Sequence, residues 1–426
     1  MLEINTLRED RKRVIEGLQK RNLPVDITEV IEHIVSLDDR RKVVQTSLDE
    51  ELSQVNAKSR EIGKLFKAGK QADASELKSQ VGTHKTIIKS LESELSNVVE
   101  DLEEAILEIP NVPHESVPNG NSANDNEEVK GWDGQLPAFD GFEALPHWDL
   151  AEKYNLIDFK LGVKIAGAGF PVFRGKGAKL ERALINFFLQ EADQAGYEEI
   201  VPPLLVNEET ARATGQLPDK EAQMYHVEKD NFYLIPTAEV PVTNILRGEI
   251  VASKDLPIKL TGYTPCFRRE AGSYGSDVKG LNRVHQFDKV EIVQVTDPSE
   301  SYEALQEMVA HVEQLLVKLE LPYRILRLCG GDMGFTSALT YDFEVFSAAQ
   351  EKWLEVSSVS NFETFQSNRL KLRYRKVDEK PQLTHTLNGS ALALARIVAA
   401  ILENNQDADG IRIPAVLHAF TGFERI

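Results

Sequence analysis

Two long runs with a heptad pattern near the N-terminus constrain the fold of this chain most strongly. Apolar residues of the first run recur in steps of three and four, interrupted only by Arg41 and Ser59, at Ile34, Leu37, Val44, Leu48, Val55, Ile62 and Leu65. The second run is more regular, with Leu77, Val81, Ile88, Leu91, Leu95, Val98, Leu102, Ala105 and Ile109. Such spacing winds two helices into a left-handed coiled coil. Residues 67–70, with a glycine, predict the turn between them.

The predicted hairpin carries an uneven distribution of charge. Each helix of about 40 residues would extend roughly 60 Å, well beyond any compact domain. Acidic residues gather towards the end of the second helix, whereas basic residues gather near the turn. The candidate nucleic-acid contacts are Lys58, Arg60, Lys64, Lys67, Lys70 and Lys78. A plain dimerisation coiled coil is the commoner use of such a pattern, but the basic tip favours an arm that touches a polyanion.

Composition limits the classes of protein that fit. A net charge of -19 argues against a nucleic-acid partner in general, although total charge says little about a local basic patch. The charged residues 1–20 are typical of neither a secretory signal nor a membrane span. Two cysteines, Cys266 and Cys329, are too few for a disulfide scaffold or a zinc cluster. We therefore expect a protein of the reducing cytoplasm, with no membrane partner.

The chain changes character after the second helix. Pro110, Pro113 and Pro118 end the helical pattern, and residues 119–128 are polar. We predict a helical domain at 1–110, a linker at 111–131 and a compact domain at 132–426.

Two polar segments in the compact domain, 266–273 and 284–291, are joined by a loop rich in glycine and serine. Polar residues alternating with apolar ones on both sides of such a loop are typical of an antiparallel strand pair. The polar face would present Arg268, Glu270 and Glu291 to one bound molecule. This pair is the strongest candidate for a functional site.

Two segments before this pair have ordinary structural interpretations. Residues 177–203 predict an amphipathic helix followed by a strand that ends in two prolines. Residues 233–239 predict an apolar strand that stops at Pro236. Thr237 then either caps a helix or, with Glu239, lines a site, and the two interpretations are compatible.

Two segments after the pair carry further polar groups. In 352–362, alternation along a strand places Glu355 and Ser357 on one face and Ser358 at the strand end. Such oxygen ligands suit Mg²⁺. In 386–396, a polar loop opens a buried helix rich in alanine and leucine. Arg396 in its first turns would need an anion or an aromatic ring as a partner.

In this order the motifs resemble those of class II aminoacyl-tRNA synthetases, and the surrounding residues resemble seryl-tRNA synthetases of the bacterial type. The resemblance covers nearly the whole chain. It implies an α+β fold, with a long antiparallel coiled-coil hairpin at the N-terminus and a catalytic domain built on an antiparallel sheet flanked by helices. It also implies activation of L-serine by ATP and transfer to tRNA(Ser), with tRNA(Sec) where that pathway exists. The hairpin would grip the tRNA, and residues 177–203 would form a homodimer interface.

The resemblance implies a role for each motif. Arg268 and Arg396 would be the catalytic residues, on the α- and γ-phosphates of ATP. The implied ATP-binding residues are Arg268, Arg269, Glu270, Val284, Phe287, Glu355, Val356, Ser357, Ser358 and Arg396. The implied serine-binding residues are Thr237, Ala238, Glu239, Arg268, Glu291, Asn388 and Ser390. Glu355 and Ser358 would hold Mg²⁺ through ATP.

Departures from the family pattern and two other functions remain open. The family usually has other residues at four positions, which are Leu339, Val359, Ala391 and Ala395. A related ligase could activate a small amino acid for a carrier protein, but it would have no use for the hairpin. A non-enzymatic RNA-binding or regulatory relative is disfavoured by four intact polar residues, Arg268, Glu270, Glu355 and Arg396.

Overall fold

The computed structural model describes residues 1–139, 141–220, 222–270 and 279–426. The chain divides into two compact units. Unit 1 comprises Met1–Gln19 and Leu23–Pro110, and unit 2 comprises Lys20–Asn22 and Asn111–Ile426. None of the helices in the described ranges combines the length and the apolar character that crossing a membrane requires.

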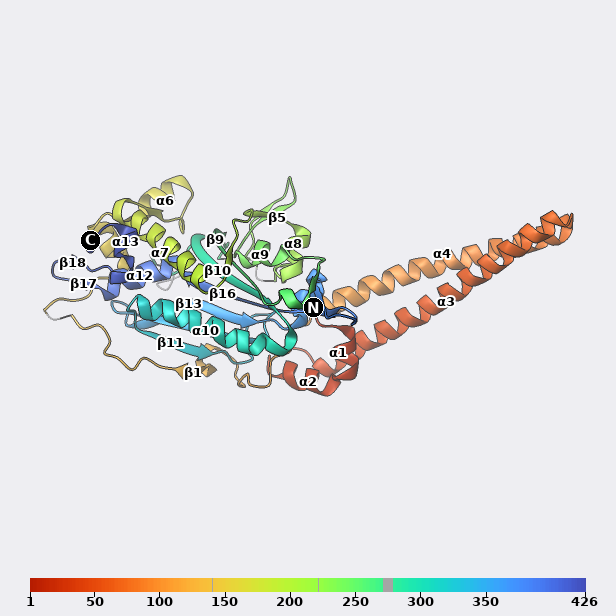
Figure 1. Cartoon of the computed structure of the whole chain (residues 1–426), viewed down its shortest axis with the longest axis horizontal. Helices are drawn as coiled ribbons and strands as arrows, with labels where there is room; N and C mark the ends of the chain where they lie inside the picture. Colours follow the sequence, from red (N-terminus) through yellow and green to blue (C-terminus); the bar gives the residue numbers. More distant parts are fainter. Residues whose placement is uncertain (140, 221, 271–278) are drawn as a thin grey trace. The chain divides into compact units, whose positions relative to one another are not determined.

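Unit 1 is helical and contains the predicted hairpin. Its helices are α1 (Ile4–Glu9), α2 (Arg11–Gln19), α3 (Ile27–Lys67) and α4 (Gln71–Leu107). Helix α3 starts where the Asp26 side chain accepts the N–H groups of Thr28 and Glu29, which satisfies donors that a helix start leaves free. Helices α3 and α4 run side by side (Figure 1). Their contact stripe is buried at Ile34, Val44, Leu48, Val81, Ile88, Val98 and Leu102, which confirms the coiled coil.

The interruption of the apolar stripe at Arg41 has a structural cause. Asp38 on the same helix is fully buried and accepts from Arg41 at 2.8 Å and from Arg8 of α1 at 2.7 Å. Lys42 lies 2.8 Å from the same carboxylate. Burial alone would raise the pKa of Asp38, but these three cations together lower it to about 2. Arg41 therefore takes part in the polar contact that ties α1 to α3.

Unit 2 is built on one large sheet. Its strand order is β1-β11-β12-β13-β16-β10-β9-β4. All neighbours are antiparallel except β4 and β9, which are parallel. The strands are β1 (Glu127–Lys130), β11 (Tyr323–Arg327), β12 (Leu339–Ser347), β13 (Lys352–Asn361), β16 (His385–Ala393), β10 (Gln286–Thr296), β9 (Ile258–Phe267) and β4 (Glu198–Glu199). This sheet contains an antiparallel pair at the predicted place, where Phe267 and Cys266 lie opposite Gln286 and Phe287. The first strand ends at Phe267, so Arg268 and Glu270 lie beyond it and not within the strand as predicted.

Three long helices cover one face of the sheet (Figure 1). They are α7 (Gly175–Gln194), α10 (Ser301–Lys318) and α12 (Leu394–Asn404), and they form the main core with Val290 and Ile292 of β10. Because alternate residues of a strand face opposite sides, Lys289 and Glu291 point away from this core. On that other face, α9 (Glu239–Asn244) packs against Val293.

Smaller elements complete unit 2. The remaining helices are α5 (His147–Lys153), α6 (Phe159–Ile165), α8 (Glu208–Thr214), α11 (Thr364–Leu370) and α13 (His418–Thr421). The remaining strands are β2 (Ile157–Asp158), β3 (Val172–Phe173), β5 (Leu205–Asn207), β6 (His226–Val227), β7 (Phe232–Leu234), β8 (Ile250–Ala252), β14 (Arg373–Arg375), β15 (Gln382–Leu383), β17 (Gln406–Asp407) and β18 (Gly410–Ile411).

Residues 111–131 do not form the separate linker that their composition suggested. Asn111 is buried, and its side-chain amide donates to the carbonyls of Thr336 and Phe362 at 2.9 and 2.8 Å. Val117 belongs to the main core, and β1 pairs with β11 at the sheet edge. Because backbone carbonyls of unit 2 accept from the Asn111 side chain, this buried polar residue keeps its hydrogen bonds.

Two other predictions need correction or lie outside the described residues. The segment expected as a polar loop before the last long helix is the central strand β16, and α12 begins only at Leu394. Pairing with β10 on one side and β13 on the other holds it extended, although alanine and leucine favour a helix. Residues 271–278 of the predicted glycine- and serine-rich loop lie outside the described residues.

Candidate active site

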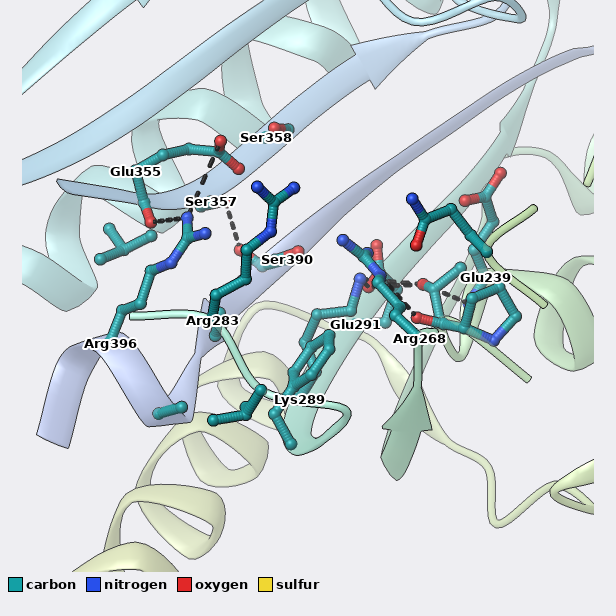
Figure 2. Close-up of a pocket in the computed structure, with 18 of the residues that line it drawn as sticks. Glu239, Arg268, Arg283, Lys289, Glu291, Glu355, Ser357, Ser358, Ser390 and Arg396 are labelled. Carbon is teal, nitrogen blue, oxygen red and sulfur yellow. Dashed lines mark hydrogen bonds and ion pairs between the residues drawn. The ribbon is translucent and has the colours of Figure 1, made fainter. Parts of the chain in front are cut away.

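A cavity of about 460 Å³ opens on the sheet face opposite the long helices. This volume is in the range of ordinary ligand sites. Most of the predicted site residues line it, namely Thr237, Glu239, Arg268, Glu270, Val284, Phe287, Glu291, Glu355, Val356, Ser357, Ser358, Asn388, Ser390 and Arg396. Figure 2 shows Glu355, Ser358 and Arg396 towards one side of the cavity, and Glu239, Arg268 and Glu291 towards the other.

Two predicted residues do not line the cavity. Ala238 is fully buried and packs with Val242, Leu260 and Val293. The backbone N–H of Arg269 donates to the carbonyl of Gln223 at 2.8 Å. Both residues lie next to cavity residues along the chain, so a contiguous motif does not place every member in the site.

Arg268 follows the end of β9 and is held by both strands of the polar pair. Its backbone N–H donates to the His285 carbonyl at 2.9 Å, and its Nε donates to the Pro236 carbonyl at 3.4 Å. The guanidinium carbon lies 5.2 Å from the centre of the Phe287 ring, within reach of a cation–π contact. These contacts position a planar cation beside an aromatic plate.

Glu270 already has an ionic partner in the structure. Its carboxylate accepts from Nε of Arg283, and its backbone N–H donates to the Gln223 side chain at 3.0 Å. Arg283 also lines the cavity, although the sequence motifs did not indicate it. Two features of the sequence could have identified it as a site residue: it directly precedes Val284, and its charge is opposite to that of Glu270.

A bulge in β13 arranges the oxygen groups differently from the prediction. Ser358 lies opposite Asp342 and Glu355 lies opposite Glu344, with a register shift between them. Asp342 and Glu344 are two residues apart and share a face of β12. Glu355 therefore shares a face with Ser358, not with Ser357, because the bulge adds one residue. Ser358 also lies within the strand and not at its end.

Arg396 bridges two parts of the cavity wall. Its Nη1 donates to the carbonyl of Glu355 at 2.6 Å, and its Nε donates to the carbonyl of Asn282 at 3.2 Å. Its side chain is 30% exposed, so it is not the buried arginine expected from the apolar helix. A half-exposed guanidinium that already has backbone acceptors is oriented and still open to an anion.

Buried charges concentrate at the opposite end of the cavity. Lys289 forms an ion pair with Glu291, and its Nζ donates to the Thr237 hydroxyl at 2.8 Å. Nε2 of Gln366 donates to the Glu239 carboxylate at 2.6 Å. The alternation of β10 could have identified Lys289, because it lies between Phe287 and Glu291 on the same face.

The carboxyl group of Glu239 has a raised pKa. Burial raises its pKa first, and the charge of Glu291 raises it further. Hydrogen bonds and the charge of Lys289 offset part of this effect, which leaves the pKa at about 7. The carboxyl group therefore ionises near neutral pH.

The four departures from the family pattern lie in or near this site. Leu339, Val359 and Ala391 are buried in the core of unit 2. Val359 packs against Gly389, where an added Cβ would lie 2.8 Å from the Val359 side chain. Ala395 lines the cavity beside Arg396.

Comparisons with known proteins cover both units. The family described as seryl-tRNA synthetase N-terminal domain matches residues 1–113, and the tRNA synthetase class II core domain (G, H, P, S and T) matches residues 225–405. A serine--tRNA ligase from Salinibacter ruber is 52% identical and covers 100% of this chain and 99% of its own. The crystal structure of seryl-tRNA synthetase from Pyrococcus horikoshii complexed with ATP has a TM-score of 0.91 at 35% identity, covering 100% of this chain and 99% of that chain. A cytoplasmic serine-tRNA ligase from Naegleria fowleri in complex with AMP has a TM-score of 0.87 at 26% identity, covering 100% and 98%.

Proposed function

The chain belongs to the seryl-tRNA synthetase family, and from this premise we propose that it activates L-serine with ATP and transfers the seryl group to tRNA(Ser). The observation that carries the proposal is one cavity lined by Arg268, Phe287 and Arg396 together with the buried acids Glu239 and Glu291. The cations suit phosphates and a carboxylate, and the acids suit an ammonium group.

The proposed reaction has two displacements. An oxygen of the serine carboxylate attacks the α-phosphorus of ATP, and the bond to the bridging oxygen breaks to release pyrophosphate. A ribose hydroxyl at the 3' end of tRNA then attacks the seryl carbonyl carbon, and AMP leaves. Arg268 would hold the carboxylate and the α-phosphate together and neutralise the charge that develops on phosphorus. Positioning supplies most of the acceleration, so no protein nucleophile is needed.

The adenine and phosphate ends would use different groups. The base would stack on Phe287, with the backbone at Val284 and the carboxylate of Glu270 at its edge. Arg396 would hold the γ-phosphate. Arg283 bonds to Glu270 in the structure, so adenine binding would share or replace that contact.

The residues on the bulged strand fit a magnesium ion. Glu355 and Ser358 offer oxygen ligands from one face, and the nearby Asp342 has a buried Oδ1 with no hydrogen-bond partner among the described residues. Glu355 and Ser358 would hold Mg²⁺ together with ATP phosphates. When bound, the ion would screen the negative charge of the phosphates.

Serine selectivity would follow from buried polar groups. Glu291 lies directly across from Ser390 in the β10 and β16 ladder, and both side chains are buried in the cavity wall. Alanine lacks the hydroxyl that these groups would bond, which leaves them unpaired and lowers affinity by orders of magnitude.

The hairpin of unit 1 would bind the tRNA. The six candidate basic side chains are exposed except for Lys58, which is half-buried and donates to Gln80 at 2.9 Å. Phosphate contacts by a basic, extended arm suit double-stranded RNA, whose deep major groove hides the bases.

We also propose a homodimer that acts in the cytoplasm. Helix α7 and the segment after β4 would form the contact, and Val201 in that segment is 88% exposed. Light scattering should give twice the chain mass. A monomer at micromolar concentration would contradict the proposed assembly.

Pyrophosphate exchange tests the proposed activity. Each amino acid is supplied in turn with ATP, and the reactive one is then tested in the charging of total tRNA. We expect serine alone to stimulate exchange strongly. Exchange stimulated by another amino acid and not by serine would overturn the substrate assignment, and exchange without tRNA charging would point to a different acceptor.

A further inference from the structure

Lys289 lies at the substrate end of the cavity without an assigned role. It projects from β10 between Phe287 and Glu291, lines the cavity, and is only 6% exposed. A buried lysine is costly unless it is paired and hydrogen-bonded. Lys289 meets both conditions through Glu291 and Thr237.

The hydroxyl of Thr237 has no bonding capacity left for a substrate. It accepts from Lys289 Nζ at 2.8 Å and from the backbone N–H of Glu239 at 3.3 Å. It also lies 3.2 Å from the Glu291 carboxylate and donates its proton there. A threonine hydroxyl has one donor and two lone pairs. Its side chain therefore cannot accept from an ammonium group, although the resemblance implied Thr237 as a serine-binding residue.

The charges at this end do not balance without a ligand. Glu239 and Glu291 supply two carboxylates when ionised, and Lys289 supplies one cation in contact with Glu291. Gln366 of α11 and Asn388 of β16 are neutral. Arg268, which follows β9, also lines the cavity, but the substrate carboxylate and the α-phosphate would neutralise it. Counted over the described residues, one negative charge remains, which equals the charge of a single ammonium group.

We propose that Lys289 is a positioning residue that sets this charge: it neutralises Glu291 and fixes Thr237, so that one carboxylate charge is left for the substrate ammonium group. The inference rests on the proposed function, because it assumes an amino acid at this end. It assigns Glu239 as the ionic partner of the ammonium group, and leaves the free oxygen of Glu291 to accept from a hydroxyl.

The proposal predicts a change in pH dependence when Lys289 is removed. Serine binding requires ionised Glu239, whose pKa is raised to about 7 by burial and by Glu291. Lys289 of β10 lowers that pKa. Among the described residues at this end of the cavity, the other charged group is Arg268, which follows β9. Loss of Lys289 would make the two carboxylates compete for one proton. The acidic limb of serine binding should therefore move to higher pH.

The test is a double-mutant cycle of K289M, E291Q and K289M/E291Q in serine-dependent pyrophosphate exchange. The single variant K289M leaves the two carboxylates of Glu239 and Glu291 without a cation, which is a net charge of about -2. The single variant E291Q leaves Lys289 with Glu239 as the remaining carboxylate, which is a net charge of about zero. The double variant restores one net negative charge. We expect K289M to raise the KM for serine about 100-fold, the scale for breaking a buried ion pair, while the KM for ATP changes less than about threefold. The double variant should regain about tenfold over K289M.

Two further variants separate charge from packing. K289R keeps the charge, so the acidic limb should stay where it is in the wild type. K259M is the matched control. Lys259 of β9 forms an ion pair with Glu307 of α10 at 3.2 Å, and it does not line the cavity. Its KM for serine should be unchanged.

The outcomes distinguish this inference from the proposed function. If the wild-type enzyme shows no exchange with serine, the proposed function fails before the variants are compared. If the wild type is active but the rise in the KM for serine in the double variant equals the product of the rises in the two single variants, the effects are independent and the role of Lys289 is refuted. An equal rise in the KM for ATP would also refute it. If K289M does not fold, the double variant is compared with E291Q, and weaker serine binding by the double variant overturns the proposal.

Discussion

Replacement of Glu239 by glutamine should stabilise the protein while removing serine binding. The pKa of Glu239 is raised from its ordinary 4.5 to about 7 by burial and by the charge of Glu291. One pKa unit is worth about 1.4 kcal/mol, so ionising this carboxyl group in the folded protein costs roughly 3 kcal/mol. Glutamine has nearly the same shape, and its carbonyl can still accept from Gln366. E239Q therefore removes the free-energy cost of ionising a buried carboxyl group and keeps the hydrogen bond from Gln366.

The sign of the pH dependence is fixed by the direction of the shift. A raised pKa means that the folded state holds its proton while the unfolded state loses it, so stability falls as pH rises from about 4.5 to about 7. The gain in E239Q should be absent below about pH 4.5, near 1.4 kcal/mol at about pH 5.5, and near 3 kcal/mol above pH 7. For unit 2, with roughly 320 residues, 3 kcal/mol raises Tm by about 5 °C.

Calorimetry at about pH 8 and about pH 5.5 measures this gain. The matched control is E403Q, because Glu403 is also buried but its pKa is lowered: burial alone would raise it, and the bonds from His147 and Ser347 outweigh that effect. Glu403 stabilises the fold above its ordinary pKa, and that contribution is lost on acidification. E403Q should therefore lower Tm at pH 8. An E239Q protein that melts at or below the wild-type Tm at pH 8, or that gains equally at both pH values, would refute the argument.

Three other perturbations test the remaining parts of the proposal. R268A should reduce serine-dependent pyrophosphate exchange more than about 1000-fold with an unchanged circular dichroism spectrum, and near wild-type exchange would exclude the assigned role. Deletion of residues 30–108 should spare exchange and abolish tRNA charging, so unchanged charging would remove the hairpin from tRNA binding. Combined replacement of Lys64, Lys67 and Lys70 by glutamine should weaken tRNA binding and lower the slope of log affinity against log salt by about two. K259M, which removes a positive charge outside the hairpin, should leave both unchanged.

Regular periodicity made much of the fold predictable from the sequence. Each heptad pattern of α3 and α4 lies within one helix and can be recognised in the sequence without knowing the partner helix, and the structure contains that hairpin. Strands β9 and β10 also form an antiparallel pair, although β9 lies mostly before the predicted polar segment and ends at Phe267. The ordered motifs placed most predicted residues in one cavity, because the motifs around β9, β10, β13 and β16 belong to one sheet and Thr237 contacts Lys289 and Glu291 of β10.

Features that depend on distant partners were not predictable in this way. The bulge in β13 arises from its register with β12, and nothing local to Glu355 marks it. Ser390 and Ala393 belong to a strand because they pair with β10, and this pairing overrides helix propensity. The pairing of Lys289 with Thr237 joins residues 52 positions apart. A sequence motif identifies a residue type, but the packing of the whole sheet decides its partner.

Strand β10 shows why the core and the site depend on one another. Val290 and Ile292 must face the long helices, and alternation then places Phe287, Lys289 and Glu291 in the cavity. A one-residue slip would turn the two charges into an apolar core, at a cost of several kcal/mol each. The apolar core therefore enforces the register that orders the charges of the site. Strand β13 depends on a break in the alternation, whereas β10 depends on regular alternation. Glu355 and Ser358 are three residues apart and share a face only because the bulge adds one residue between them.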